Sequence, residues 1–168
     1  EQVLSQIEVL NQDYRRLNPD SQFTPAAFRA VAADTRIQFC MASVDPQGQP
    51  TDGINRISIS GSPFRDSYIN EVIKPNTIWD PDRYFNIWVC NIAGGILGYA
   101  QFPTSSGLVG IPVDNGARQT DGVVIHFNAF GTTGTAVPPF NRGRTGTHEI
   151  GHWLGLRHIW GDGPCNVD

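Results

Sequence analysis

Three of the four histidines in this 168-residue chain lie in one short stretch, from His148 to His158. His148 and His152 are four residues apart, a spacing that places both imidazoles on one face of an α-helix. Two imidazoles placed in this way can bind one zinc ion. Glu149 follows the first histidine and would lie beside the ion, where its carboxylate can act as a general base. The spacing therefore predicts a helix that carries a zinc site.

A third ligand requires the chain to turn back after this helix. His158 lies six residues beyond His152, and a straight helix would point its side chain elsewhere. Gly155 stands between them, and glycine readily adopts the left-handed conformation that ends many helices. We therefore expect a turn at Gly155 that returns His158 to the metal. The complete pattern is H-E-x-x-H-x-x-G-x-x-H, which is much rarer by chance than H-E-x-x-H alone.

The hydrophobic periodicity predicts an α/β (α+β) fold, in which a mixed sheet is backed by helices. Helices are expected over residues 3–17, over 25–33 with Thr24 as the N-cap, and briefly over 67–74. Strands are expected where β-branched and aromatic residues alternate with polar ones; these runs are 36–42, 54–60, 84–92, 96–102 and 122–130.

Charge and hydropathy exclude several classes of partner. The formal net charge is −4, only Lys74 is a lysine, and the basic residues form no stripe, so nucleic acid and anionic membranes are not expected partners. No apolar run approaches membrane-spanning length. No targeting signal opens the chain, so we expect such a segment to be absent or already removed.

The three cysteines form no C-x-x-C pair, which argues against a thiolate zinc site. Cys40 and Cys90 each lie in a strand-like run, and neighbouring strands could bring them together as a disulfide. Two buried free thiols are the alternative. Cys165 is left over, which suggests a partner outside this chain.

The stretch "HEIGHWLGLRHIWGD" (148–162) resembles the zinc motif of the metzincin metalloproteases. Within them it is most similar to the pappalysin family, especially secreted bacterial proteases with a cytophagalysin-like catalytic domain. Astacins usually have Glu where this chain has Ile159. Weaker similarities extend over nearly the whole chain, in the segments 6–16, 37–48, 85–92, 97–103 and 121–131.

The resemblance implies a twisted, mixed five-stranded sheet with backing helices and a zinc-binding active-site helix. It implies that Glu149 is the catalytic base and that the zinc ligands are His148, His152 and His158. The edge strand 97–102 would bind the substrate backbone as an added strand, since a free edge offers unpaired N–H and C=O groups. The substrate-binding residues would then be Gly98, Tyr99, Ala100 and Gln101.

The family also has a lower part of the catalytic domain, with a methionine-containing turn beneath the metal. The only methionine here is Met41, far upstream of the zinc helix. We therefore expect residues 1–168 to form the upper, N-terminal part of a metalloprotease catalytic domain, with the lower part absent from this chain.

These observations favour a secreted zinc endopeptidase that binds a protein or peptide substrate as an extended strand. The alternatives are a non-catalytic, zinc-containing peptide-binding module and a zinc hydrolase of non-peptide substrates; Glu149 argues against the first. The resemblance also implies calcium, for which Asp162 and Asp168 are candidates. Extracellular location follows from the resemblance and from the expected disulfide. His126 is expected to be a sheet residue rather than part of the cleft.

Overall fold

The computed structural model describes residues 1–102 and 117–158. The chain divides into two compact units. One unit combines Glu1–Asn55 with Asn128–Thr147, and the other combines Arg56–Phe127 with the residues from His148 onward. Among the described residues, no helix has the length and apolar character needed to cross a membrane.

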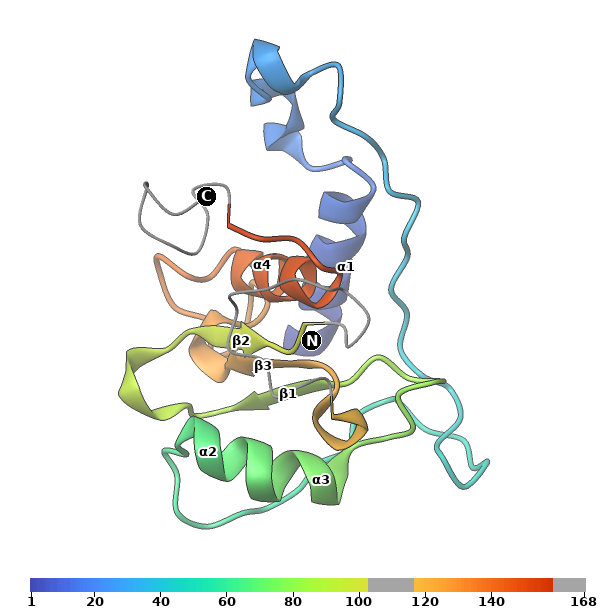
Figure 1. The fold of residues 1–168 in the computed structure, drawn as a ribbon, viewed down its shortest axis with the longest axis vertical. Coiled ribbons are helices and arrows are strands. Elements are labelled where there is room, and N and C mark those ends of the chain that lie inside the picture. Colours follow the sequence, from blue (N-terminus) through green and yellow to red (C-terminus); the bar gives the residue numbers. More distant parts are fainter. Residues whose placement is uncertain (103–116, 159–168) are drawn as a thin grey trace. The chain divides into compact units, whose positions relative to one another are not determined.

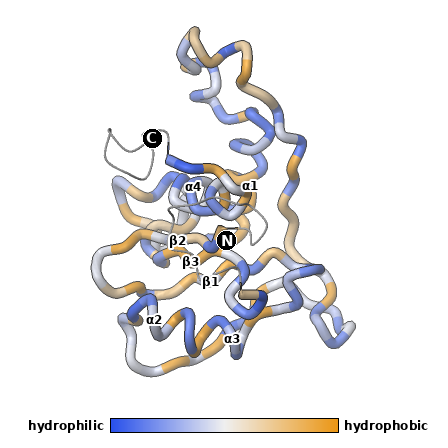
Figure 2. Tube along the Cα trace, viewed as in Figure 1, coloured by the Kyte–Doolittle hydropathy of each residue, from blue (hydrophilic) through white to orange (hydrophobic). Residues whose placement is uncertain are grey.

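The second unit is built on a mixed three-stranded sheet with the strand order β1-β3-β2 (Figure 1). The central strand β3 (Val123–His126) pairs in parallel with β1 (Ile87–Cys90) and antiparallel with β2 (Gly98–Ala100). Three consecutive residues of β3, Val123 to Ile125, have no exposed surface, and Figure 2 shows the hydrophobic character of these strands. Within the described residues β2 is an edge strand.

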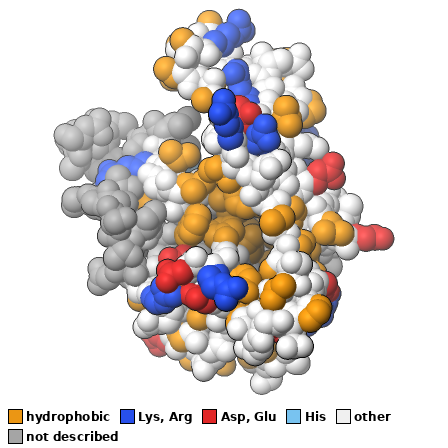
Figure 3. Space-filling view, turned by 90° about the vertical axis from the view of Figure 1, so that its right-hand side faces the viewer, with side chains coloured by type: hydrophobic (Ala, Val, Ile, Leu, Met, Phe, Trp, Pro, Cys, Tyr) orange, Lys and Arg blue, Asp and Glu red, His pale blue; other side chains and the backbone are white. Residues whose placement is uncertain are grey.

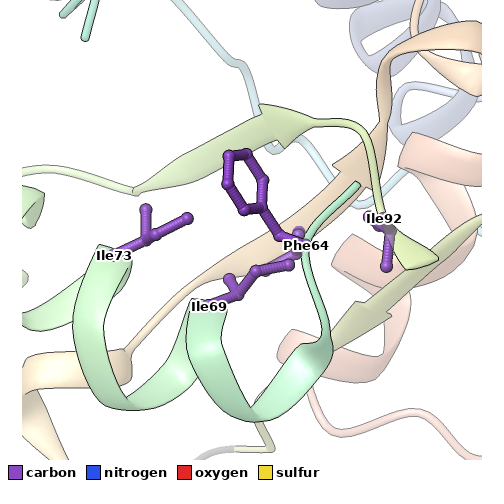
Figure 4. Close-up of a cluster of buried hydrophobic side chains, with 5 residues drawn as sticks. Phe64, Ile69, Ile73 and Ile92 are labelled. Carbon is purple, nitrogen blue, oxygen red and sulfur yellow. The ribbon is translucent and has the colours of Figure 1, made fainter. Parts of the chain in front are cut away.

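One face of this sheet is covered by a helical segment, visible in Figure 1. It consists of α2 (Asp66–Tyr68), the π-helical turn η3 (Ile69–Ile73) and α3 (Lys74–Thr77). Its apolar side packs into a hydrophobic cluster against β3 (Figure 4). The cluster comprises Phe64, Ile69, Ile73, Ile92 and Val124.

Helix α4 (Arg144–Trp153) carries the histidine motif. The residues of α4 from His148 onward belong to the second unit. Trp153 Nε1 donates a hydrogen bond of 2.7 Å to Asp121, and the Trp153 ring centroid lies 4.4 Å from that of Phe85. These contacts fix the C-terminal end of α4 against the segments that flank the sheet.

The first unit is organised around α1 (Gln2–Tyr14), whose buried side is partly polar. Gln6 is fully buried, and its amide donates to the Gly143 carbonyl at 2.9 Å and accepts from the Gly131 N–H at 2.7 Å. Tyr14 donates its hydroxyl hydrogen to the Thr147 carbonyl at 3.0 Å. Helix α1 thereby holds the loop before α4 and the first turn of α4.

The N-terminal helices are shorter than the periodicity predicts. Arg16 has φ 55° and Leu17 N–H donates to the Gln12 carbonyl, so α1 ends before Leu17, which is 71% exposed. The helix expected over 25–33 is wrong: the structure has 3₁₀ turns, η1 (Pro19–Phe23) and η2 (Ala26–Phe28), with no buried residue. This segment, at the top of Figures 1 and 3, carries exposed hydrophobic side chains and so has little packing to stabilise a helix.

The strands expected at 36–42 and 54–60 do not form, and the described residues have a sheet of three strands rather than five. The backbone of Phe39 bonds instead to a side chain, because Asn11 accepts from its N–H at 2.7 Å and donates to its carbonyl at 2.9 Å. The strands expected at 84–92, 96–102 and 122–130 are confirmed with shorter bounds, as is the mixed α/β architecture.

Candidate metal centre and active site

The three histidines converge through their Nε2 atoms. Nε2 of His152 lies 2.9 Å from Nε2 of His148 and 3.2 Å from that of His158, and the remaining pair is 3.1 Å apart. Three nitrogens bound to one tetrahedral zinc ion, each about 2.0–2.1 Å away, would lie roughly 3.3 Å apart. The donor set and its spacing therefore fit a zinc ion. Within the described residues this is the one such group of His, Cys, Asp or Glu side chains.

The return of His158 depends on a turn centred on Gly155. Its φ of +92° lies in the left-handed region, as the sequence predicts. The Gly155 N–H bonds to the His152 carbonyl at 2.8 Å, and the Leu156 N–H bonds to the Gly151 carbonyl at 2.9 Å. This pair of bonds is the Schellman motif, which ends α4 and reverses the chain. The turn brings His158, ten positions after His148, back to the Nε2 atoms of His148 and His152.

The same turn orients His152. Its Nδ1 lies 2.7 Å from the Leu156 carbonyl oxygen, which can only accept a hydrogen bond, so Nδ1 carries the hydrogen. The neutral ring then presents the lone pair of Nε2 to the centre of the triad. Burial lowers the pKa of His148, and the neighbouring His152 and His158 lower it further, which favours the neutral, ligand-competent ring.

Glu149 lies beside the histidines in an enclosed position, with only 7% of its surface exposed. This burial raises the pKa of its carboxyl group to about 7. The neighbouring edge strand comes unusually close: a Cβ at Gly98 would lie 2.9 Å from Glu149 Cγ and 2.9 Å from the Val124 carbonyl oxygen. Only glycine therefore lets β2 and Glu149 approach each other in this way.

Strand β2 presents part of its backbone away from the sheet. His126 N–H bonds to the Leu97 carbonyl at 2.8 Å, and Gln101 N–H bonds to the Gly122 carbonyl at 3.2 Å. Antiparallel pairing alternates, so the polar groups of Gly98 and Ala100 face outward, along the open edge. Gln101 is buried, and its side chain is bonded to Thr120 and Ala117.

A cleft of about 590 Å³ lies between the three histidines, Glu149 and the edge strand β2. One side is formed by Glu149 and the three histidines, another by β2, and a third by the helical segment α2–α3. Asp66, Asn70 and Lys74 line that third side, and no sequence pattern marks them. The arrangement can hold a metal ion and place a buried carboxylate and an open strand edge beside it.

Comparison with known families identifies this arrangement. Residues 65–168 match the Peptidase M43 family, described as pregnancy-associated plasma protein-A. The chain belongs to this family. The pappalysin resemblance drawn from the zinc motif is thereby confirmed, and the Peptidase M43 family is one of metalloendopeptidases.

Fungal relatives of this Peptidase M43 chain are named extracellular metalloproteases. The protein from Pyricularia oryzae is 30% identical over 165 residues, which cover 98% of this chain and 44% of that protein. The protein from Colletotrichum graminicola is 41% identical over 69 residues, which cover 41% of this chain and 22% of that protein. The chain thus spans less than half of the length of these relatives.

Solved structures similar to this Peptidase M43 chain include mature mirolysin from Tannerella forsythia in complex with a cleaved peptide. It has a TM-score of 0.84 and 46% identity, covering 96% of this chain and 58% of mirolysin. A promirolysin mutant from the same organism gives a TM-score of 0.83 and 46% identity, with 51% of that chain covered.

The sequence analysis also singles out three cysteines, a fourth histidine and two aspartates. Cys40 is exposed and Cys90 half-buried, both as free thiols, and burial raises the pKa of Cys90 to about 11. They belong to different compact units, so their disulfide stays a prediction. His126 is a sheet residue of β3, as expected, with its Nε2 atom 3.1 Å from Asn91 Oδ1. Asp162, Asp168 and Cys165 lie outside the described residues.

Proposed function

We propose that this Peptidase M43 chain carries the zinc centre and the substrate-binding edge strand of a secreted zinc endopeptidase. The observation that carries the proposal is the convergence of three Nε2 atoms beside a buried carboxylate, that of Glu149. A purely structural zinc site needs no such base, and structural sites close the fourth position with another protein ligand. In this proposal His148, His152 and His158 hold the ion.

Zinc, when bound, supplies a Lewis acid that acidifies water and polarises the scissile carbonyl. Glu149 accepts the proton of the attacking water and delivers it to the leaving amine nitrogen. Burial raises the pKa of this carboxyl group, which makes its carboxylate a better acceptor for the proton of water. The carbonyl of Leu156 keeps His152 in the tautomer that binds metal.

The substrate is proposed to bind as an extended peptide along β2. Its backbone would pair with the outward polar groups of Gly98 and Ala100, because these are the groups that β3 leaves unpaired. Support comes from the likeness to mirolysin, whose structure contains a cleaved peptide.

Secretion of the whole protein is supported by the relatives named extracellular metalloproteases. Asp162 and Asp168 are proposed calcium ligands because oxygen-rich loops suit calcium. The resemblance to the family supports calcium binding and a catalytic domain divided into an upper and a lower part.

Cleavage that depends on a metal is the first expected result. The intact protein should hydrolyse members of a quenched fluorescent peptide library, lose that activity after dialysis against a strong chelator, and regain it when zinc is added. The measurement is the initial rate of fluorescence increase, with metal content determined in parallel. Peptide binding without cleavage would favour the non-catalytic module, and chelator-sensitive hydrolysis of esters alone would favour a non-peptide hydrolase.

Gly98→Ala is expected to reduce kcat/KM on the order of 100-fold, because the new methyl group would force Glu149 and β2 apart. Zinc content should not change, since no ligand is touched. Gly94→Ala is the matched control: a Cβ there meets no atom within 4 Å, so only its backbone conformation is strained. Equal activity in the wild type and the Gly98→Ala variant would contradict the proposed role of this close approach.

A further inference from the structure

The chain's only lysine lies in the interior of the second unit. Lys74 is the first residue of α3, and just 1% of its surface is exposed. Lysine is rarely buried so completely, because removing an ammonium group from water is costly unless protein groups replace the water. The environment of its Nζ atom therefore indicates what this side chain does.

The ammonium nitrogen lies against two aromatic rings of the sheet. Nζ is 5.2 Å from the ring centroid of Trp88 on β1 and 5.0 Å from that of Tyr99 on β2, distances typical of cation–π contacts. Both residues stand opposite Val124 in the register of the sheet, one on each side of it. Lys74 thus spans the sheet from β1 to the edge strand.

Lys74 also reaches the end of the edge strand. Its Nζ donates a hydrogen bond of 3.2 Å to the Thr120 carbonyl, and the Thr120 hydroxyl donates to Gln101 Oε1 at 2.5 Å. The preceding turn of the helical segment adds a second contact with β2, because Tyr99 donates its hydroxyl hydrogen to Asn70 Oδ1 at 3.1 Å. The position of β2 therefore depends on Lys74 and Asn70 of the helical segment that covers this face of the sheet.

This dependence has a consequence for substrate binding. Strand β2 has only three residues and pairs with β3 on one side, while the polar groups of Gly98 and Ala100 face outward. We propose that Lys74 is a positioning residue that holds the edge strand β2 in the geometry needed to pair with a peptide substrate. The inference rests on the proposed peptidase function, and Lys74 itself touches no reacting atom.

The test is Lys74→Met in the intact protein, a change that keeps the length of the side chain and removes its charge. KM for a quenched peptide should rise about tenfold, the scale of a desolvated cation–π contact, while kcat and zinc content stay within twofold of the wild type. Lys74→Arg should recover part of the loss, since a guanidinium group also stacks on aromatic rings.

Leu10→Val is the control for lost stability. Leu10 is fully buried in the other compact unit, so this change lowers the melting temperature with no expected effect on KM. If Lys74→Met does not fold, Tyr99→Leu removes the same contact from the strand side and should raise KM similarly. Where both variants fold, the KM of the Lys74→Met/Tyr99→Leu double variant should not exceed the higher KM of the two single variants, because both changes remove the same contact.

An unchanged KM in folded Lys74→Met or Tyr99→Leu protein would overturn the inference, and so would a fall in kcat and zinc content with KM constant. A wild-type protein that cleaves no peptide would instead overturn the proposed function. The two failures are therefore distinguishable.

Discussion

A Glu149→Gln variant is expected to bind one zinc ion per chain and to lose at least about 1000-fold in kcat/KM, the scale of general acid–base catalysis. Glutamine has nearly the same size as glutamate, so the close contact with Gly98 is preserved. Its amide cannot accept the proton of water and return it to the leaving amine. Zinc content by mass spectrometry and cleavage of a quenched peptide measure the two effects independently.

Glu71→Gln is a suitable control for this experiment, because Glu71 is an exposed glutamate of the same unit in η3. Its activity should match that of the wild type. Full activity of Glu149→Gln would remove Glu149 from the mechanism. Loss of zinc together with activity would show that Glu149 supports the metal site rather than the proton transfer.

The convergence of the three histidines was predictable because these residues are close in sequence. The four-residue spacing of His148 and His152 is set by helix geometry, and the turn at Gly155 follows from the conformational freedom of glycine. Both features are found as expected. The family could also be recognised from this one stretch, since the match includes it.

The lack of strands at 36–42 and 54–60 was not predictable in the same way. Residues 36–42 alternate like a strand, yet the backbone of Phe39 is satisfied by the side chain of Asn11. Alternation indicates which side chains could face a core, but not which groups complete the backbone hydrogen bonds. That information lies in residues distant in sequence.

The roles of Gly98 and Lys74 also depend on contacts with residues distant in sequence. From the sequence, Gly98 is one residue of the expected edge strand, whereas in the structure it lies so close to Glu149 that a Cβ would clash. Lys74 would be expected at the surface by its residue type. Its partners, Trp88, Tyr99 and Thr120, lie between 14 and 46 residues away in the sequence, and only the fold brings them together.

Gly155→Val is expected to weaken zinc binding by roughly 10–100-fold, the usual range for groups that orient metal ligands. A β-branched residue strongly disfavours the left-handed conformation that Gly155 adopts, with φ +92°. Relief of that strain breaks the turn that returns His158 and moves the Leu156 carbonyl away from His152. One substitution thus disturbs two ligands, and a competition titration with a chelating dye measures the affinity.

The control must separate backbone strain from an effect on the metal. Gly48 also has a positive φ, +81°, and a Cβ there would likewise meet no atom within 4 Å, but it lies in a loop of the other unit. Gly48→Val should therefore lower the melting temperature and leave the zinc affinity unchanged. If both variants bind zinc as tightly as the wild type, the turn is not what positions His158, and the third ligand must be held by other contacts.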